Sequence, residues 1–184
     1  MRRFIAIVIA AMALSVLVAA PVLAEERTCR GSIGARTLDN VRVPQGATCI
    51  LVGTYVKGTI KVERGATLEA RRVRVVGNVQ AENHRSVLLR NSTVGGSVQL
   101  KQGGSAKVVG NRITGDLQFD ADRRAIRAKN NRINGSLQAM SNSGGVAIIT
   151  NRIDGNLQCK SNSPAPTGGG NIVQGNKEDQ CRRL

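Results

Sequence analysis

A glycine recurs along this chain at an almost constant interval, and this repeat restricts the possible folds more than any other feature. It stands in segments of the type apolar-x-Gly-x-apolar, such as VKGTI and ITGDL. The intervals are 19, 19, 19, 20, 20 and 20 residues, and the glycines are Gly58, Gly77, Gly96, Gly115, Gly135, Gly155 and Gly175. A repeat this short cannot bury its own apolar face, so the copies must stack into a solenoid.

Within each copy, apolar residues alternate with polar ones, which is the periodicity of a β-strand rather than of a helix. β-branched residues dominate several apolar positions, for example Val56 and Ile113, each two residues before its glycine. A further copy surrounds Asp39, which takes the glycine position. We therefore predict an all-β fold, a single-stranded parallel β-helix (solenoid) with three short strands in each rung of 19–20 residues. About eight rungs, each about 4.8 Å high, make a rod about 38 Å long.

The first 24 residues are expected to lie outside this domain. A basic start is followed by an apolar run from Phe4 to Ala20, and small residues then precede Glu25. This order is typical of a secretory signal peptide cleaved after Ala24. The alternative is a retained membrane anchor, since a run of 17 residues reaches the lower limit for a span. Cleavage leaves no stable membrane span and one secreted or periplasmic domain, residues 25–184, with 25 Lys and Arg against 12 Asp and Glu, or +13.

Four cysteines fall into two pairs near the ends of the predicted rod. Cys29 and Cys49 are 20 residues apart and Cys159 and Cys181 are 22 apart, so each interval is about one rung. Four cysteines allow three pairings, but the other two would have to cross the length of the rod. We therefore expect the disulfides Cys29–Cys49 and Cys159–Cys181 to staple the end caps. A metal or redox site is the weaker alternative, because the chain has no CxxC motif and one histidine. We expect no metal and no cofactor.

Two rows of amide side chains are expected to run along the rod. The first stands four residues before the glycine, at Asn111, Asn131, Asn151 and Asn171. Stacked identical amides can hydrogen-bond along the axis and satisfy polar groups at a buried turn. The second row stands three residues after the glycine, at Gln80, Gln99, Gln118, Gln138 and Gln158. We interpret it as amide stacking on the surface, with a flat shelf for sugar hydroxyls as the alternative.

Basic residues occupy several outward positions, and they are the main candidates for function. One row stands three residues before the glycine, at Arg112, Arg132 and Arg152. The preceding strand of each rung is expected to carry Arg71, Arg90, Lys107, Arg127 and Lys129 on its outer face. Like charges about 5 Å apart repel by roughly 1 kcal/mol in water, and an acidic polymer along the rod would relieve that repulsion. The competing interpretation is a solvated surface that keeps rods apart.

The acidic residues give little support for catalysis. Asp116, Asp120 and Asp122 share one rung and Asp154 lies two rungs away, while Glu82, Lys101 and Asp120 are expected to form an alternating salt ladder on the surface. Polysaccharide cleavage needs converging carboxylates, so we expect no enzyme. His84 is expected at the surface in a turn, and the stretch PAPTGGG (164–170) as a loop or cap inserted into the last rung.

The glycine repeat resembles right-handed parallel β-helix proteins, the superfamily that includes pectate lyases and bactofilins, and the short rungs are nearest to bactofilins. This resemblance covers Asp39 to Gln180 and implies a right-handed helix. The signal peptide departs from the cytoplasmic bactofilins, and the C-terminal stretch from Gly155 to Cys181 resembles the ending of small secreted bacterial proteins without an assigned function.

Together these features predict an exported, non-enzymatic binding or structural solenoid. It would engage a polyanion (acidic polysaccharide, lipopolysaccharide or extracellular DNA) through its basic rows, as a monomer or with rod-to-rod association. The alternatives are a self-assembling scaffold and a polysaccharide lyase or hydrolase.

Overall fold

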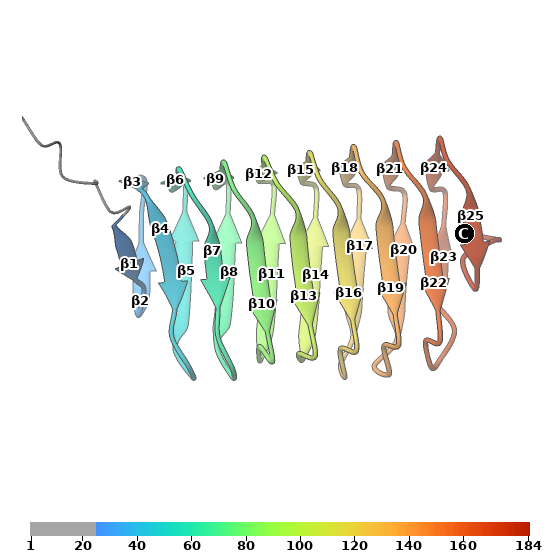
Figure 1. Cartoon of the computed structure of the whole chain (residues 1–184), viewed down its shortest axis with the longest axis horizontal. Helices are drawn as coiled ribbons and strands as arrows, with labels where there is room; N and C mark the ends of the chain where they lie inside the picture. The colour runs from blue at the N-terminus through green and yellow to red at the C-terminus, as the bar shows by residue number, and fades with distance from the viewer. Residues whose placement is uncertain (1–24) are drawn as a thin grey trace, which may run out of the picture.

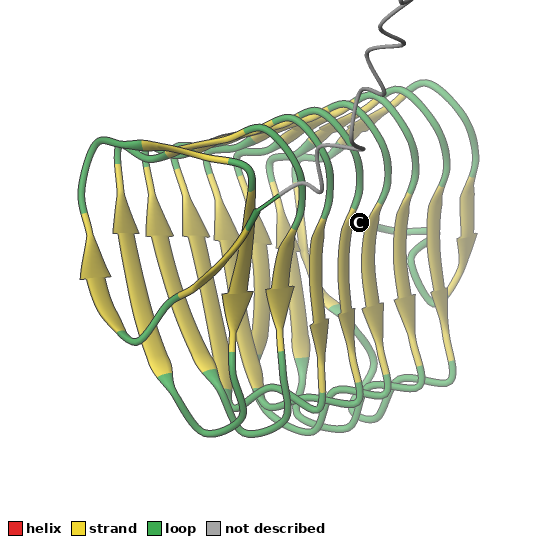
Figure 2. Ribbon diagram, turned by 60° about the vertical axis from the view of Figure 1, so that its left-hand side comes forward, coloured by secondary structure: helices red, strands yellow, loops and turns green. Residues whose placement is uncertain are grey.

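The computed structural model describes residues 25–184, so the predicted signal peptide lies outside the described part of the chain. Every regular element in this part is a β-strand, and the strands wind into a rod of about eight turns (Figure 1). Each turn adds one strand to each of three parallel sheets, which run along the rod as three walls (Figure 2). The predicted all-β parallel solenoid with three strands per rung is confirmed. Residues 25–184 contain no helix long and apolar enough to cross a membrane.

The three sheets take every third strand of the chain. Sheet A consists of β1 (Glu26–Thr28), β4 (Asn40–Val43), β7 (Ile60–Val62), β10 (Val79–Glu82), β13 (Val98–Lys101), β16 (Leu117–Asp120), β19 (Leu137–Met140), β22 (Leu157–Lys160) and β25 (Lys177–Asp179). Sheet B consists of β2 (Gly31–Ile33), β5 (Thr48–Val52), β8 (Thr67–Arg71), β11 (Ser86–Arg90), β14 (Ser105–Val109), β17 (Ile126–Lys129), β20 (Val146–Ile149) and β23 (Thr167–Gly169). Sheet C consists of the short strands β3 (Thr37–Leu38), β6 (Tyr55–Val56), β9 (Arg74–Val75), β12 (Thr93–Val94), β15 (Arg112–Ile113), β18 (Arg132–Ile133), β21 (Arg152–Ile153) and β24 (Ile172–Val173).

Aliphatic side chains fill the interior and stack in register from rung to rung. Val79 pairs with Ile60 on one side and with Val98 on the other, and all three are fully buried. Phe119 is the largest fully buried side chain, and it lies between Leu100 and Ala139 in its column. Close packing explains why so narrow an interior is built from Val, Ile, Leu and Ala rather than from aromatic rings.

The recurring glycine is required because successive rungs approach closely at the bend between sheets C and A. A Cβ on Gly77 would lie 2.7 Å from the carbonyl oxygen of Gly58 in the preceding rung. The N–H of Gly77 donates to that same oxygen at 2.9 Å. A side chain would therefore push the rungs apart and break this hydrogen bond.

The residue after each glycine forms a hydrogen-bond ladder that we did not predict. Asn78 Oδ1 accepts the N–H of Ser97 at 2.8 Å, and Ser97 Oγ accepts the N–H of Asp116 at 3.0 Å. The ladder continues along the rod through Asn40, Thr59, Asn78, Ser97, Asp116, Ser136, Asn156 and Asn176. Every member has a side-chain oxygen, and this shared property is visible in the sequence.

Two disulfides fasten the ends of the rod with the pairing that the spacing predicted. Cys29 bonds to Cys49 and Cys159 bonds to Cys181, with Cα–Cα distances of 5.5 and 5.2 Å. No cysteine is left free. Disulfides persist in oxidising compartments, so both bonds are compatible with an extracellular or periplasmic protein.

The stretch PAPTGGG (164–170) is not an inserted loop, and that prediction was wrong. It contains β23, which pairs in register with β20 through Ala147 and Thr167. These two residues are 20 apart, the ordinary rung length, so the stretch occupies the sheet B position of the last rung. Gly168 is needed there because a Cβ would collide with the carbonyl oxygen of Ile148.

Candidate anion-binding surface

Three arginines align along the outer face of sheet C, and we call Arg112, Arg132 and Arg152 the arginine row. Arg112 pairs in register with Arg132, and Arg132 pairs with Arg152. All three are exposed, while the isoleucine that follows each of them is fully buried. Each short strand thus holds its arginine outward by anchoring the next side chain in the core. Neighbouring strands lie about 4.8 Å apart, so the three cations form a regular series.

The arginine row has little acidic compensation. Within residues 25–184, its one ion pair joins Arg152 Nε to Asp154 Oδ1 at 3.8 Å, at the long end of the range for such contacts. Thr93 and Ile172 continue the row at its two ends. The row therefore offers a cationic track with neutral residues at its borders.

Sequence reasoning missed one member of this column. Arg74 pairs with Thr93, which pairs with Arg112, so Arg74 extends the outward column with one threonine between. Its guanidinium carbon lies 5.4 Å from the ring centroid of Tyr55, within the range of a cation–π contact. The position three residues before Gly77 would have identified it.

The basic residues of sheet B lie in two separate rows. Arg71 pairs with Arg90, but Val109 then separates Arg90 from Lys129. The other row pairs Lys107 with Arg127.

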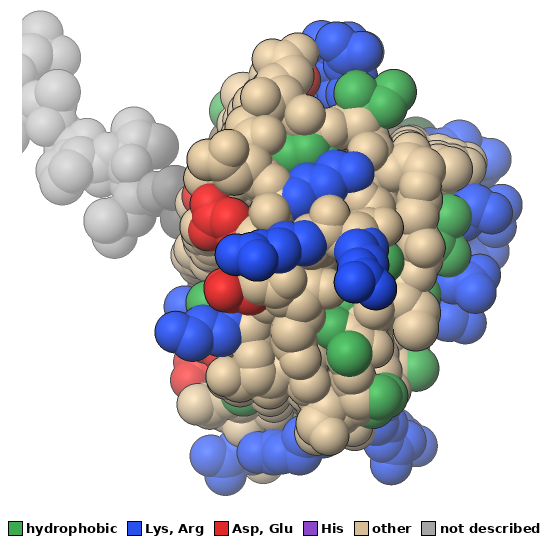
Figure 3. Space-filling model, turned by 90° about the vertical axis from the view of Figure 1, so that its right-hand side faces the viewer, with side chains coloured by type: hydrophobic (Ala, Val, Ile, Leu, Met, Phe, Trp, Pro, Cys, Tyr) green, Lys and Arg blue, Asp and Glu red, His purple; other side chains and the backbone are tan. Residues whose placement is uncertain are grey.

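The reason is that Lys107 and Lys129 occupy different outward positions of their strands, two residues apart in register. Arg71 is also partly neutralised, because its guanidinium donates to Glu69 Oε2 at 3.0 Å. Sheet B therefore offers shorter and less regular cationic series than sheet C. Seen from the C-terminal end, Lys and Arg side chains project from several sides of the rod (Figure 3).

The glutamine row lies on the outer face of sheet A, where the side chains hydrogen-bond along the axis. Gln80 donates to Gln99 at 3.2 Å, Gln99 to Gln118 at 3.3 Å, and Gln138 to Gln158 at 3.0 Å. Gln158 also donates to Glu178 at 2.7 Å. The amides largely satisfy one another, which supports the interpretation of the row as surface amide stacking.

The alternating row beside it is present in register but not as ion pairs. Glu82 pairs with Lys101, and Lys101 pairs with Asp120. Among the described residues, no salt bridge joins them within 4.0 Å. The predicted salt ladder was therefore wrong: the three charges alternate in backbone register, but no ion pair joins their side chains.

The asparagine row is buried and makes the axial hydrogen bonds that we predicted. The side-chain Oδ1 of Asn131 accepts both the backbone N–H of Asn111 and its Nδ2–H, each at 3.0 Å. The Nδ2 group of Asn131 donates to Val108 O at 2.8 Å and to Asn151 Oδ1 at 2.9 Å. The same pattern continues to Asn171. The row is structural, because its polar atoms are occupied within the rod.

A second buried polar column lies at the bend between sheets A and B. The column comprises His84, Gly103, Asp122, Asn142 and Asn162, and the exposed Gln180 ends it by accepting the N–H of Asn162. His84 is 2 % exposed and Asp122 is fully buried, so the prediction of a surface histidine was wrong. The imidazole fills the volume that a Cβ on Gly103 would need. Because Gly103 has no side chain, the imidazole ring of His84 fits inside the bend.

Burial favours the uncharged forms of the two titratable groups in this column, Asp122 and His84. Desolvation raises the pKa of Asp122 to about 7, a hydrogen bond from the Gly103 backbone lowers it, and Asp120 and Arg123 act with smaller opposite effects. Desolvation lowers the pKa of His84 to about 4, and the backbone of Ser105 opposes this only in part. Asp122 Oδ2 and both ring nitrogens of His84 lack a well-formed hydrogen bond.

The acidic residues considered for catalysis do not converge. Asp116 Oδ1 accepts the N–H of Ser136 at 2.8 Å as part of the ladder at the C–A bend. Asp120 lies at the other end of β16, about 13 Å along the strand at about 3.3 Å per residue. Asp154 lies on the sheet C side, beside Arg152. Within residues 25–184, no group of three or more His, Cys, Asp or Glu side chains could hold a metal ion.

The chain was compared with protein-family models, with curated proteins and with solved structures, and none of the three comparisons gives a match.

Proposed function

We propose that this protein is an exported, non-enzymatic module that binds polyanions along the outside of its rod. The observation that carries the proposal is the register of the arginine row, in which Arg112, Arg132 and Arg152 lie directly above one another and face solvent. Holding like charges at this spacing costs roughly 1 kcal/mol per adjacent pair in water. A ligand with regularly spaced negative charges would offset that cost at every rung.

The class of ligand is inferred from the high positive charge of the chain and from its small number of aromatic side chains. The chain has a formal charge of +15 but only two Phe, one Tyr and no Trp. Stacking surfaces that read sugar rings or bases are therefore scarce. Binding would rest on charge and would depend weakly on the sequence of the polymer, with acidic polysaccharide, lipopolysaccharide and extracellular DNA as the candidate ligands.

We also infer that residues 1–24 direct export and that the domain acts in the periplasm or outside the cell. The two disulfides support this localisation, because such bonds are rare in the cytoplasm. The rung length and glycine repeat further support kinship with right-handed parallel β-helix proteins of the pectate lyase and bactofilin type. That kinship carries no activity over to this chain.

Retention on immobilised heparin tests the proposal. The variant Arg112→Gln/Arg132→Gln/Arg152→Gln should elute at a clearly lower salt concentration than the wild type. A control with the same charge change, Arg30→Gln/Arg85→Gln/Arg182→Gln, alters exposed residues that are scattered over the rod and should elute later than the row variant. Equal elution of the two triple variants would show that net charge, and not the arginine row, causes retention.

A further inference from the structure

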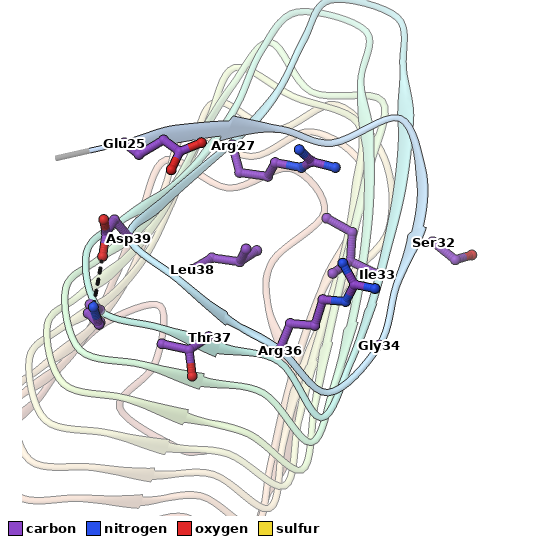
Figure 4. Close-up of a pocket in the computed structure, with 10 residues that line it drawn as sticks. Glu25, Arg27, Ser32, Ile33, Gly34, Arg36, Thr37, Leu38 and Asp39 are labelled. Carbon is purple, nitrogen blue, oxygen red and sulfur yellow. Dashed lines mark ion pairs between the residues drawn. The ribbon is translucent and has the colours of Figure 1, made fainter.

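Within residues 25–184, no segment covers the N-terminal end of the rod, whereas the C-terminal end is covered. At the C-terminal end, Cys181 and Leu184 are buried against the last rung. At the N-terminal end, the first rung surrounds a cavity of about 520 Å³ (Figure 4). Ile33 and Leu38 line this cavity and pack against the end of the core. Its volume lies within the range of small-molecule sites, about 300–1,000 Å³.

Two arginines of the first rung take positions that face the interior elsewhere in the rod. Arg27 pairs in register with the fully buried Val41, so its side chain is directed over the open lumen (Figure 4). Arg36 occupies the column in which the fully buried Thr54 follows one rung later. At both positions, later rungs place an uncharged side chain inward, whereas the first rung places an arginine there. We call this N-terminal opening of the rod, with its two arginines, the mouth.

These two cations lack acidic partners among residues 25–184, where no carboxylate lies within 4.0 Å of either guanidinium. The other charged groups around the cavity are Glu25 and the ion pair between Lys57 Nζ and Asp39 Oδ1, at 3.1 Å. The pair is internally neutral and Glu25 offsets one arginine. The mouth therefore carries a net charge suited to a single anionic group.

We infer that the mouth of the rod binds a small amphiphilic monocarboxylate. Its carboxylate would lie between the guanidinium groups of Arg27 and Arg36, because the planar donor fork of arginine matches a carboxylate. Its apolar body would contact Ile33 and Leu38, which leave apolar surface at the end of the core. The site contains no residue of the arginine row, so this inference can be confirmed or refuted independently of the polyanion proposal.

Calorimetric titration of the full chain with decanoate, below its micelle-forming concentration, tests this inference. Decanoate should bind with saturation, and the neutral decanol should bind about tenfold or more weaker, since hydrogen bonds to charged groups are worth about 1.5–3 kcal/mol. Arg27→Gln/Arg36→Gln should reduce the decanoate affinity to that of decanol. The control Arg85→Gln/Arg182→Gln makes the same charge change at exposed residues outside the cavity lining and should leave the affinity unchanged.

Three results would overturn the inference: no saturable decanoate binding, an unchanged affinity in Arg27→Gln/Arg36→Gln, or an equal loss in the control variant. The substituted side chains are exposed, so both variants should unfold at the wild-type temperature. A fourth result would also contradict it, namely that the mouth is closed by a second copy. In that case the protein would sediment as a dimer at titration concentrations, and Leu38→Asp would restore the monomer.

Discussion

Asp122 stands directly over Asn142 in the buried column, and its N–H donates to Asn142 Oδ1 at 2.9 Å. Asn142 in turn uses its Nδ2 group to donate to Phe119 O at 3.1 Å and to Asn162 Oδ1 at 2.8 Å. An ionised carboxylate at position 122 cannot make the equivalent donation to a backbone carbonyl. The column therefore matches an amide better than an ionised carboxylate at this position.

We expect Asp122→Asn to stabilise the protein at pH 8 and to change little at pH 4. The folded pKa is raised from 3.8 to about 7, so the folded state binds more protons than the unfolded state between these values. The contribution of Asp122 to stability is thus lost as the pH rises from about 4 to about 7. The gain from the amide at pH 8 is on the order of 4 kcal/mol, and urea unfolding at both pH values measures it.

A matched control for this substitution is Asp116→Asn. Asp116 is half-buried in the ladder at the C–A bend, where Asn78 and Asn156 already occupy the same column. The same chemical change should therefore have a small effect there. If Asp122→Asn gave no more stability than Asp116→Asn at pH 8, the buried carboxylate would not carry the predicted cost.

The Asp122→Asn substitution should also reveal the contribution of His84 to the pH dependence of stability, which has the opposite sign. The folded pKa of His84 is lowered from 6.5 to about 4, so the unfolded state binds more protons in this window and stability rises with pH. In the wild type, the opposite pH dependences caused by Asp122 and His84 cancel between about pH 4 and 6.5. Together these two groups leave the free energy of unfolding nearly independent of pH in that interval. In Asp122→Asn, stability should rise by about 3 kcal/mol over that interval. A flat profile in the variant would contradict the buried, neutral histidine.

Breaking the asparagine row should destabilise the rod strongly. In Asn131→Ala, the N–H of Asn111 and the carbonyl oxygen of Val108 lose their side-chain partner at a buried site. Each unsatisfied group costs about 1–3 kcal/mol, so we expect a loss of about 3 kcal/mol in denaturant unfolding. Asn134→Ala, an exposed asparagine in the same rung, is the control and should stay within about 0.5 kcal/mol of the wild type.

Replacing one residue of a bend by glycine should increase the stability of the protein. Ala121 has a φ of 54° at the bend between sheets A and B, a left-handed conformation that costs a non-glycine residue about 1–2 kcal/mol. We expect Ala121→Gly to raise the unfolding free energy by about 1 kcal/mol. Ala128→Gly, inside the buried strand β17, should instead lower it. Destabilisation by both substitutions would show that the bend is not strained.

The regular part of the fold could be predicted because identical chemistry recurs at identical spacing. The glycines, the asparagines and the cysteines each repeat at about one rung, so sequence spacing translates directly into position along the axis. Arg74 was missed because Thr93 interrupts its row, and the ladder after the glycine because its members share only a side-chain oxygen.

The buried polar column was beyond this reasoning for a different reason. Its members are chemically unlike, with His84, Gly103, Asp122 and Asn142 at equivalent positions. The spacing also changes from 19 to 20 residues between Asp122 and Asn142. Each member from His84 to Asn162 nevertheless stands seven residues after its repeat glycine, so the unlike chemistry of the side chains, and not the spacing, hid the column. Burial of a histidine in the bend between sheets A and B depends on the space beside Gly103, which only the packed structure reveals.

The salt dependence of duplex DNA binding tests the polyanion account most directly. For a protein that neutralises phosphates, log Kobs falls with log[salt] by about 0.9 per contact. If the arginine row lies along the polymer, Arg112→Gln/Arg132→Gln/Arg152→Gln should make this slope shallower by about 2–3 relative to the wild type. The scattered Arg30→Gln/Arg85→Gln/Arg182→Gln control should retain a slope close to that of the wild type. An unchanged slope in the row variant, or a wild-type slope near zero, would contradict the account.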